Sequence, residues 1–363
     1  MRFVLRLQVP SLFFILCCYS LQSAAQDKKY YFFQPFNYGS ESTFNPVSLI
    51  ANGGFDELQS YWRSSSLSEI PWKNGSKNVW YNIIAPLPQI SKYGWHDFVF
   101  HEIIPRSFNM NDAQYFPNYT LHLIGGGMQY RKVEEWFDYY KYPLPVAWAI
   151  ITTMGYHYIN EILENGDWRG PNTDPIADLL IFDPLGIVLF SFDDVCRFFS
   201  SELNLNDWNN QPAFSFGPLG LQNTGQNFVI KYPLSASGKT SLLYHFGAFG
   251  ELGLSFKTNQ EDAISVGVGM TSNNVATSLN SNGAPHFTIT VGPRAGIYWD
   301  RNNSLMASIV ASDNLHGLVL MNIYPGVFSS TSFSPGFFLL ASNGGTFTIG
   351  ITASFLPLGL STK

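Results

Sequence analysis

The stretch HFTITVGPRAGIYWD, residues 286–300, decides the expected fold, because apolar and polar residues alternate along its whole length. Side chains of a β-strand point alternately to its two faces, so this pattern predicts a strand with one apolar face. The opposite face would carry threonine, glycine and two charged residues, Arg294 and Asp300. The apolar face would carry Phe287, Ile289, Val291, Pro293, Ala295, Ile297 and Trp299.

Other parts of the chain alternate in a similar way and are bounded by Gly, Asn, Ser and Pro, as strands joined by turns are. The clearest are Ser241–Lys257 and Gly345–Phe355. Three strands are also expected upstream, at Asn78–Ile84, Gly94–Ile104 and Asn118–Arg131. Less regular candidates are 226–234, 262–272, 304–313, 315–324 and 334–342. Together these segments predict roughly twelve strands, an even number typical of single-chain bacterial barrels.

Composition distinguishes the two architectures that such strands allow. A soluble sandwich normally exposes Lys and Glu on its wet face, whereas a transmembrane barrel turns apolar residues to lipid and lines its lumen with polar groups. Only 13% of residues are charged and 16% are aromatic, which suits the lipid-facing wall and aromatic girdles of a barrel. We therefore expect an all-β fold with a helical insert, namely an antiparallel transmembrane β-barrel. A soluble sandwich is the alternative, and disordered, coiled-coil and nucleic-acid-binding proteins are disfavoured.

Residues 1–25 have the features of a signal peptide. Arg2 and Arg6 form the basic end, Leu12–Cys18 forms a short apolar core, and Ser23–Ala25 offers small residues for cleavage. We expect export and localisation in the outer membrane of a Gram-negative bacterium. Two of the three cysteines lie in this segment, so Cys196 would be a single thiol in the mature chain, and we expect it to be buried and inert.

The rest of the chain is expected to divide into three parts. Residues 26–131 would be an N-terminal extension with the first barrel strands, and residues 205–363 would form the main barrel strands. Residues 132–204 have helical length and spacing and would form a helical insert, either plugging the lumen or facing the periplasm. An inner-membrane helical protein is a distant alternative, because the apolar run Val146–Ile159 is shorter than the about 20 residues of a membrane span.

The chain resembles Gram-negative outer-membrane β-barrel proteins. The resemblance rests on the signal segment, the long alternating strands, and a last strand that reads TIGITASF and ends at the aromatic Phe355. The block Asn118–Pro212, which contains LHLIGGGM at residues 121–128, is similar to uncharacterised envelope proteins of Bacteroidetes-type bacteria. The resemblance implies a cellular location and no particular activity.

One helix face carries the best candidate for chemistry. His157, Glu161 and Glu164 are spaced by four and three residues, so they share a face of the second predicted helix. Such a set could bind a metal or act in acid–base catalysis, or it could be the solvated face of an amphipathic helix. Asp178 is unusual because apolar residues flank it. We assign His157, Glu161 and Asp178 as candidate catalytic residues, with His157 as the base and Glu161 or Asp178 orienting it.

A second set of charged residues falls on the inward faces of the expected barrel strands. These lumen-facing candidates, which could pair with one another or tune a pore, are His245, Glu251, Lys257, Arg294 and Asp300.

Two functions from different classes remain open. The first is a non-enzymatic outer-membrane barrel in transport or envelope maintenance, with an unknown small-molecule ligand. The second is an outer-membrane hydrolase of phospholipid or lipid A esters that uses the His and carboxylate set. We expect outer-membrane lipid and the barrel assembly machinery as partners, no nucleic acid, and neither a cofactor nor a bound metal.

Overall fold

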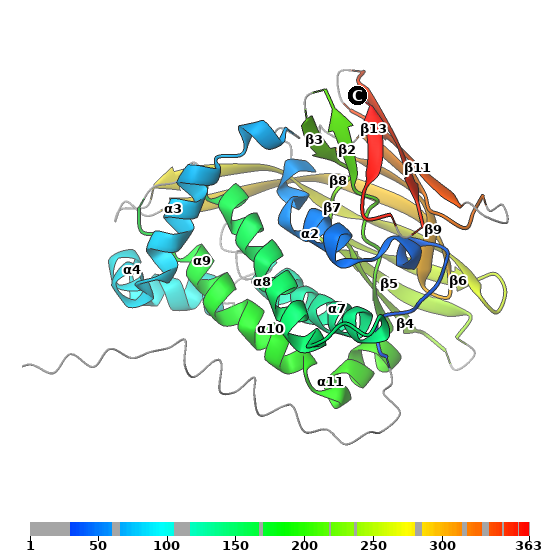
Figure 1. The fold of residues 1–363 in the computed structure, drawn as a ribbon, viewed down its shortest axis with the longest axis horizontal. Coiled ribbons are helices and arrows are strands. Elements are labelled where there is room, and N and C mark those ends of the chain that lie inside the picture. Colours follow the sequence, from blue (N-terminus) through cyan, green and yellow to red (C-terminus); the bar gives the residue numbers. More distant parts are fainter. Residues whose placement is uncertain are drawn as a thin grey trace, which may run out of the picture. The chain divides into compact units, whose positions relative to one another are not determined.

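Helical segments precede all the strands along the part of the chain that the structure describes (Figure 1). The computed structural model describes residues 30–59, 66–104, 117–166, 170–217, 219–235, 238–279, 285–313, 318–328, 334–342, 345–354 and 356–362. The expected signal peptide lies outside these residues. The elements below all belong to the unit Tyr31–Lys363.

In the part of the chain that the structure describes, the helical region contains α-helices, short 3₁₀ segments and the π-helical segments η5, η7, η8 and η9. The α-helices are α2 Pro46–Gly54, α3 Trp72–Ile83, α4 Pro86–Tyr93, α5 Trp95–Asp97, α7 Gly127–Tyr139, α8 Pro145–Glu164, α9 Asp174–Ala177, α10 Asp183–Phe190 and α11 Asp193–Arg197. The other segments are η2 Ser40–Thr43, η3 Asp56–Gln59, η4 Leu67–Glu69, η5 Phe98–Ile103, η7 Asn118–Gly126, η8 Asp178–Phe182 and η9 Phe198–Glu202.

The strands form one mostly antiparallel sheet of thirteen, in the order β1-β4-β5-β6-β7-β8-β9-β10-β11-β12-β13-β2-β3. One neighbouring pair, β13 with β2, is parallel. The strands are β1 Leu205–Asp207, β2 Ala213–Phe216, β3 Leu219–Gln222, β4 Phe228–Pro233, β5 Thr240–Phe246, β6 Phe249–Lys257, β7 Asp262–Leu279, β8 Pro285–Arg301, β9 Ser304–Ser312, β10 Val319–Ile323, β11 Pro335–Ala341, β12 Phe347–Ala353 and β13 Gly359–Thr362.

The predicted β-rich fold with a helical part is confirmed, and most predicted strands after residue 204 coincide with observed ones. The deciding stretch 286–300 lies within β8, and the five less regular candidates overlap β4, β7, β9, β10 and β11. The prediction of one continuous strand over Ser241–Lys257 is wrong, because β5 and β6 form a tight hairpin there. Gly247 makes the turn possible, since a Cβ at this position would lie 2.4 Å from the Gln226 carbonyl oxygen.

The three strands predicted upstream of residue 132 are wrong, because these segments are helical. Asn78–Ile84 lies mainly in α3, Gly94–Ile104 forms α5 and η5, and Asn118–Arg131 forms η7 and the start of α7. The helical part is therefore not an insert of residues 132–204 between barrel strands. In the described residues it begins near residue 40, and every strand follows it.

A buried stripe of polar and small residues explains this error. In α3 the buried positions are Gly75, Asn78, Val79 and Asn82, which repeat with helical spacing. In η7 they are Asn118, His122, Gly125 and Gly126. Because few of these residues are apolar, a search for apolar periodicity does not detect the buried face.

The sheet has an inverted distribution of side chains, with apolar residues on its exposed face. The register aligns Tyr232 with Leu242, Leu254, Val266, Ile297 and Ile309, and then with Met321, Leu339 and Ile349 on successive strands. All of these are exposed except Met321 and Leu339, which are half-buried. The opposite face buries polar side chains, among them Lys231, His245, Glu251, Ser255, Ser265, Asp300, Ser308, Asn322, Thr348 and Thr352.

Helices α7 and η7 contact the ends of β1 and β4. Gln129 on α7 accepts a hydrogen bond of 2.6 Å from Gln226, and Gly125 on η7 lies against the ring of Phe228. Phe228 and Phe246 belong to the same apolar core as Met128, Tyr156 and Phe190 from the helices. Cys196 is also part of this core, and burial raises the pKa of its thiol to about 12, so the predicted burial of Cys196 is confirmed.

Among the described residues, no single helix has both the length and the apolar composition to cross a membrane. The segments Asp174–Phe190 and Asp193–Glu202 reach that length and composition only as a pair, which is bent by 85°.

Candidate functional site

Five buried titratable side chains gather among the helices and form what we call the histidine–carboxylate cluster. His122 comes from η7, His157 and Glu161 from α8, Asp178 from η8 and Asp183 from α10. Each has at most 6% of its surface exposed. Two of the contributing segments, η7 and η8, are π-helical, a rare form that occurs frequently at functional sites.

His122 connects two carboxylates, because each of its ring nitrogens faces a different one. Its Nδ1 lies 2.9 Å from Asp183 Oδ1, and its Nε2 lies 3.6 Å from Asp178 Oδ2. Burial by itself lowers the pKa of His122. The negative charges of Asp178 and Asp183 have the opposite and larger effect, so the pKa is raised to about 10. The two carboxylates therefore favour a positive charge at this position.

His157 lies beside His122 but has the opposite electrostatic character. The two ring centroids are 4.8 Å apart, and His157 Nε2 is 3.3 Å from Asp183 Oδ1. Burial lowers the pKa of His157 to about 3, so its ring is neutral at pH 7. Its Nε2 has no hydrogen-bond partner among the described residues. Gly126 provides the space for this ring, since a Cβ there would lie 2.7 Å from His157 Nε2.

Glu161 and Asp178 form a carboxyl pair on the other side of His122. A carboxylate oxygen of one lies within 4.8 Å of a carboxylate oxygen of the other, and Asn165 donates a hydrogen bond of 2.9 Å to Glu161 Oε2. Burial raises the pKa of Asp178 to about 7 and also raises that of Glu161. One oxygen of each, Glu161 Oε1 and Asp178 Oδ1, has no partner among the described residues.

The cluster has the ligand types of a metal centre. Three overlapping groups each place their ligand atoms within 4.8 Å of one another. The first is His122, His157 and Asp183, and the second is His122, Glu161 and Asp178. The third adds Glu164 and Asp174 to Glu161, with Glu164 exposed. Carboxylates that are this deeply buried are stable only when protons or cations neutralise them.

The three candidate catalytic residues all lie in this cluster, but in different contacts from those expected. His157 approaches Asp183 and His122. Glu161 and Asp178 instead approach each other and His122. Asp183 therefore occupies the position of an orienting carboxylate for His157, which the sequence prediction assigned to Glu161 or Asp178.

Four of the five lumen-facing candidates lie on or next to the polar buried face of the sheet. Glu251 accepts hydrogen bonds of 3.0 Å from Arg294 and 2.5 Å from Tyr298, and lies 3.0 Å from His245 Nδ1. Asp300 pairs with Lys231 at 2.7 Å. Lys257 is exposed at the end of β6. A cavity of about 110 Å³ adjoins this face, and His245, Arg294 and Tyr298 are among its lining residues.

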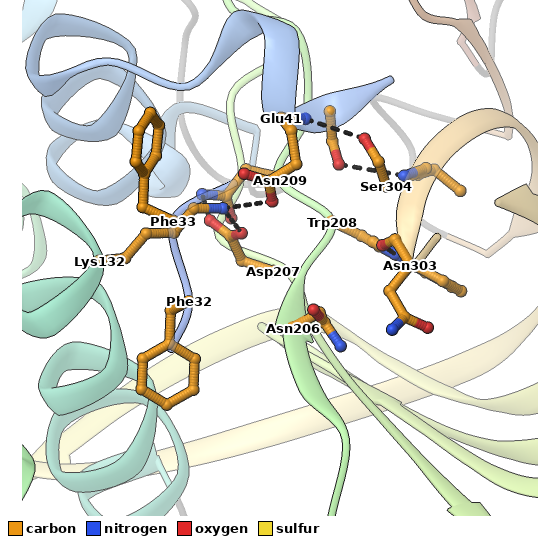
Figure 2. A network of polar contacts seen from close by, with 12 residues as sticks. Phe32, Phe33, Glu41, Lys132, Asn206, Asp207, Trp208, Asn209, Asn303 and Ser304 are labelled. Carbon is orange, nitrogen blue, oxygen red and sulfur yellow. Dashed lines mark hydrogen bonds and ion pairs between the residues drawn. The ribbon is translucent and has the colours of Figure 1, made fainter. Parts of the chain in front are cut away.

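A third polar site joins the helices to the sheet (Figure 2). Lys132 on α7 is buried, and its Nζ pairs with Asp207 at the end of β1 and, at 2.5 Å, with Glu41 on η2. Asn209 donates to the second oxygen of Asp207. The Glu41 backbone nitrogen donates to Ser304 Oγ at the start of β9. One buried cation thus links three segments that are far apart in the sequence.

Sequence reasoning did not select several residues that matter here. They are Asp183, which follows the apolar run Leu179–Phe182, and Lys132, Glu41 and Asp207. The spacing of Asn118, His122 and Gly126 by four residues is the signal that could have found His122, because it matches a helix as well as a strand.

No family model matches the chain, and neither a curated protein nor a solved structure is similar to it.

Proposed function

We propose that this chain is an outer-membrane β-barrel protein with a non-enzymatic role in transport or envelope maintenance. The main support is the apolar row from Tyr232 to Ile349, which runs across nine consecutive strands on the exposed face. Exposed apolar surface of this extent is typical of a membrane interface. Lipid is the favoured occupant, since the opposite face of the same strands is polar, as in the wall of a membrane barrel.

Chain connectivity favours closure of the sheet. β1 pairs with β4 at one end of the strand order, and β2 pairs with β13 near the other end. Only residues 208–212 separate β1 from β2, and six residue steps span at most about 20 Å. One continuous segment, 205–216, would therefore close the gap between β4 and β13. Together with β4–β13, this segment would make an odd number of strands. A closed sheet with an odd number of strands cannot be antiparallel throughout and needs one parallel pair. The pair β13–β2 is parallel.

The paired charges on the inner face favour a non-enzymatic wall. Glu251 is bound by Arg294 and Tyr298, and Asp300 is bound by Lys231. Such pairs neutralise buried charges and hold the inner surface together, as in a structural wall. The helical part, docked through Lys132 and Gln129, would act as a plug or cap at the β1 and β4 end.

Cell fractionation followed by electrophoresis with and without boiling tests this proposal. A folded membrane barrel resists detergent at room temperature, so the unboiled outer-membrane band should migrate differently from the boiled one. Recovery in the periplasm, without any heat-dependent shift, would mean that the sheet is part of a soluble protein.

A second candidate function is hydrolysis of envelope lipid esters. The observation that favours it is the neutral His157 ring, whose Nε2 lies 3.3 Å from Asp183 Oδ1, because a general base must start unprotonated. Purified protein should then release fatty acid from phospholipid vesicles, and His157→Ala should abolish the release while keeping the heat-dependent band shift. Equal release by the variant and the parent would exclude this function.

A further inference from the structure

We propose that His122, Glu161 and Asp178 bind one divalent transition-metal cation of the Zn²⁺ type, in a site enclosed by η7, α8 and η8. The inference does not depend on the barrel, because all three ligands come from the helical part. His122 would supply Nε2, and each carboxylate would supply one oxygen. Asp183 and His157 would lie in the surrounding shell.

The hydrogen bond of His122 decides which of its nitrogens is the ligand. Nδ1 is 2.9 Å from Asp183 Oδ1, at the distance of a strong donor–acceptor contact. A cation that binds His122 displaces one ring proton, and because Nδ1 keeps its proton in the contact with Asp183, the lone pair becomes available on Nε2, the nitrogen on the side of Asp178. Metal-binding histidines usually donate their other N–H to a carboxylate in this manner.

The carboxylates provide free ligand atoms at a suitable spacing. Glu161 Oε1 and Asp178 Oδ1 have no hydrogen-bond partner among the described residues, although both side chains are almost completely buried. The ligand atoms of His122, Glu161 and Asp178 lie within 4.8 Å of one another. Ligand atoms at about 2.1 Å from a tetrahedral ion are about 3.4 Å apart, so the side chains have to close by up to about 1.4 Å to bind it.

The alternative group of His122, His157 and Asp183 fits less well. In that group His122 would have to bind through Nδ1, which would break its hydrogen bond to Asp183. The ligand set also indicates the type of ion. Imidazole nitrogen with carboxylate oxygens suits Zn²⁺ and similar first-row cations, whereas Ca²⁺ and Mg²⁺ prefer oxygen alone.

Equilibrium dialysis of the purified full-length chain against Zn²⁺, after treatment with a chelator, tests the site. We expect one Zn²⁺ per chain, and a d–d absorption spectrum typical of low coordination number when Co²⁺ replaces it. Glu161→Gln and Asp178→Asn should each weaken Zn²⁺ binding at least tenfold. Asp194→Asn is the matched control, because Asp194 is an exposed carboxylate on α11 that pairs only with nearby Arg197 among the contacts described. This variant should bind Zn²⁺ with the same affinity as the parent.

Two further variants test the assignment of roles. Asp183→Asn should weaken binding about 10- to 100-fold by removing the partner of His122 Nδ1. His157→Gln should stay within about threefold of the parent. Near-UV circular dichroism shows that each variant is folded. The proposal is overturned if the folded parent binds no stoichiometric Zn²⁺, if Glu161→Gln and Asp178→Asn both bind it as the parent does, or if His157→Gln abolishes binding.

Discussion

Lys132 shows at the scale of one residue how the helices are held to the sheet. Its ammonium group is buried between Glu41 and Asp207 and lies 4.4 Å from the centroid of the Phe44 ring. Lys132→Met would leave two buried carboxylates without their cation, which typically costs about 3–5 kcal/mol. We expect a correspondingly lower free energy of unfolding in urea, while Lys73→Met, at an exposed position of α3, should change it by less than about 0.5 kcal/mol. Equal stability of the two variants would show that the buried ion pairs do not hold the helices in place.

Glu41 predicts how stability depends on pH. Burial raises its pKa from the ordinary value of 4.5 to about 7, despite the opposing attraction of Lys132. The folded chain therefore binds a proton more tightly than the unfolded chain does. This contribution is fully present below about pH 4.5 and is lost as the pH rises through about 7.

Glu41→Gln should accordingly flatten the fall of stability between pH 5 and pH 8. The free energy of unfolding at pH 5 minus that at pH 8 should shrink by an amount on the order of 3 kcal/mol, since each pKa unit corresponds to about 1.4 kcal/mol. Thermal unfolding midpoints at several pH values measure this difference. Glu69→Gln, at an exposed carboxylate, is the control, and a Glu41→Gln profile parallel to the parent's would contradict the assignment.

The residues of the histidine–carboxylate cluster could be predicted only in part. His157 and Glu161 share a helix face, and this local spacing is visible in the sequence. His122 and Asp183 reach the same point from other elements, 35 residues before and 26 residues after His157 in the numbering. Their proximity depends on how the helices pack, which no local pattern encodes.

At the scale of elements, glycines set how closely the helices approach one another. A Cβ on Gly127 would lie 2.5 Å from the Phe190 ring and 2.7 Å from the Gly186 carbonyl oxygen, whereas a Cβ on Gly155 would meet nothing within 4 Å. Gly127→Ala should therefore destabilise the fold by about 1–3 kcal/mol, because α7 and α10 must move apart. Gly155→Ala, in the interior of α8, should stabilise it by up to about 1 kcal/mol. Urea unfolding of both variants measures these changes. If the free energy of unfolding changes in the same direction in both, the close contact between α7 and α10 does not determine the effect of the substitution.

The predictability of each element follows from what its buried face is made of. The strands after residue 204 alternate between apolar and polar residues, so their positions could be predicted even though the apolar face is the exposed one. The helices before residue 132 bury Asn, His and Gly, as α3 and η7 do, and their periodicity escapes an apolar search. The short strands β1, β2, β3 and β13 also went unpredicted, because three or four residues are too few to reveal a period.

At the scale of the whole molecule, the inverted sheet predicts opposite effects of a charge in lipid and in water. Val266 is exposed in the apolar row, between Leu254 and Ile297. If lipid covers the row, Val266→Arg should cost up to about 2–4 kcal/mol near the membrane centre and reduce the folded, heat-shifting form in the outer membrane. Gln260→Arg adds the same charge at the exposed β6–β7 turn and should assemble as the parent does. If the row faces water, Val266→Arg should instead be tolerated and improve solubility, so equal assembly of the two arginine variants would remove the main support for a membrane barrel.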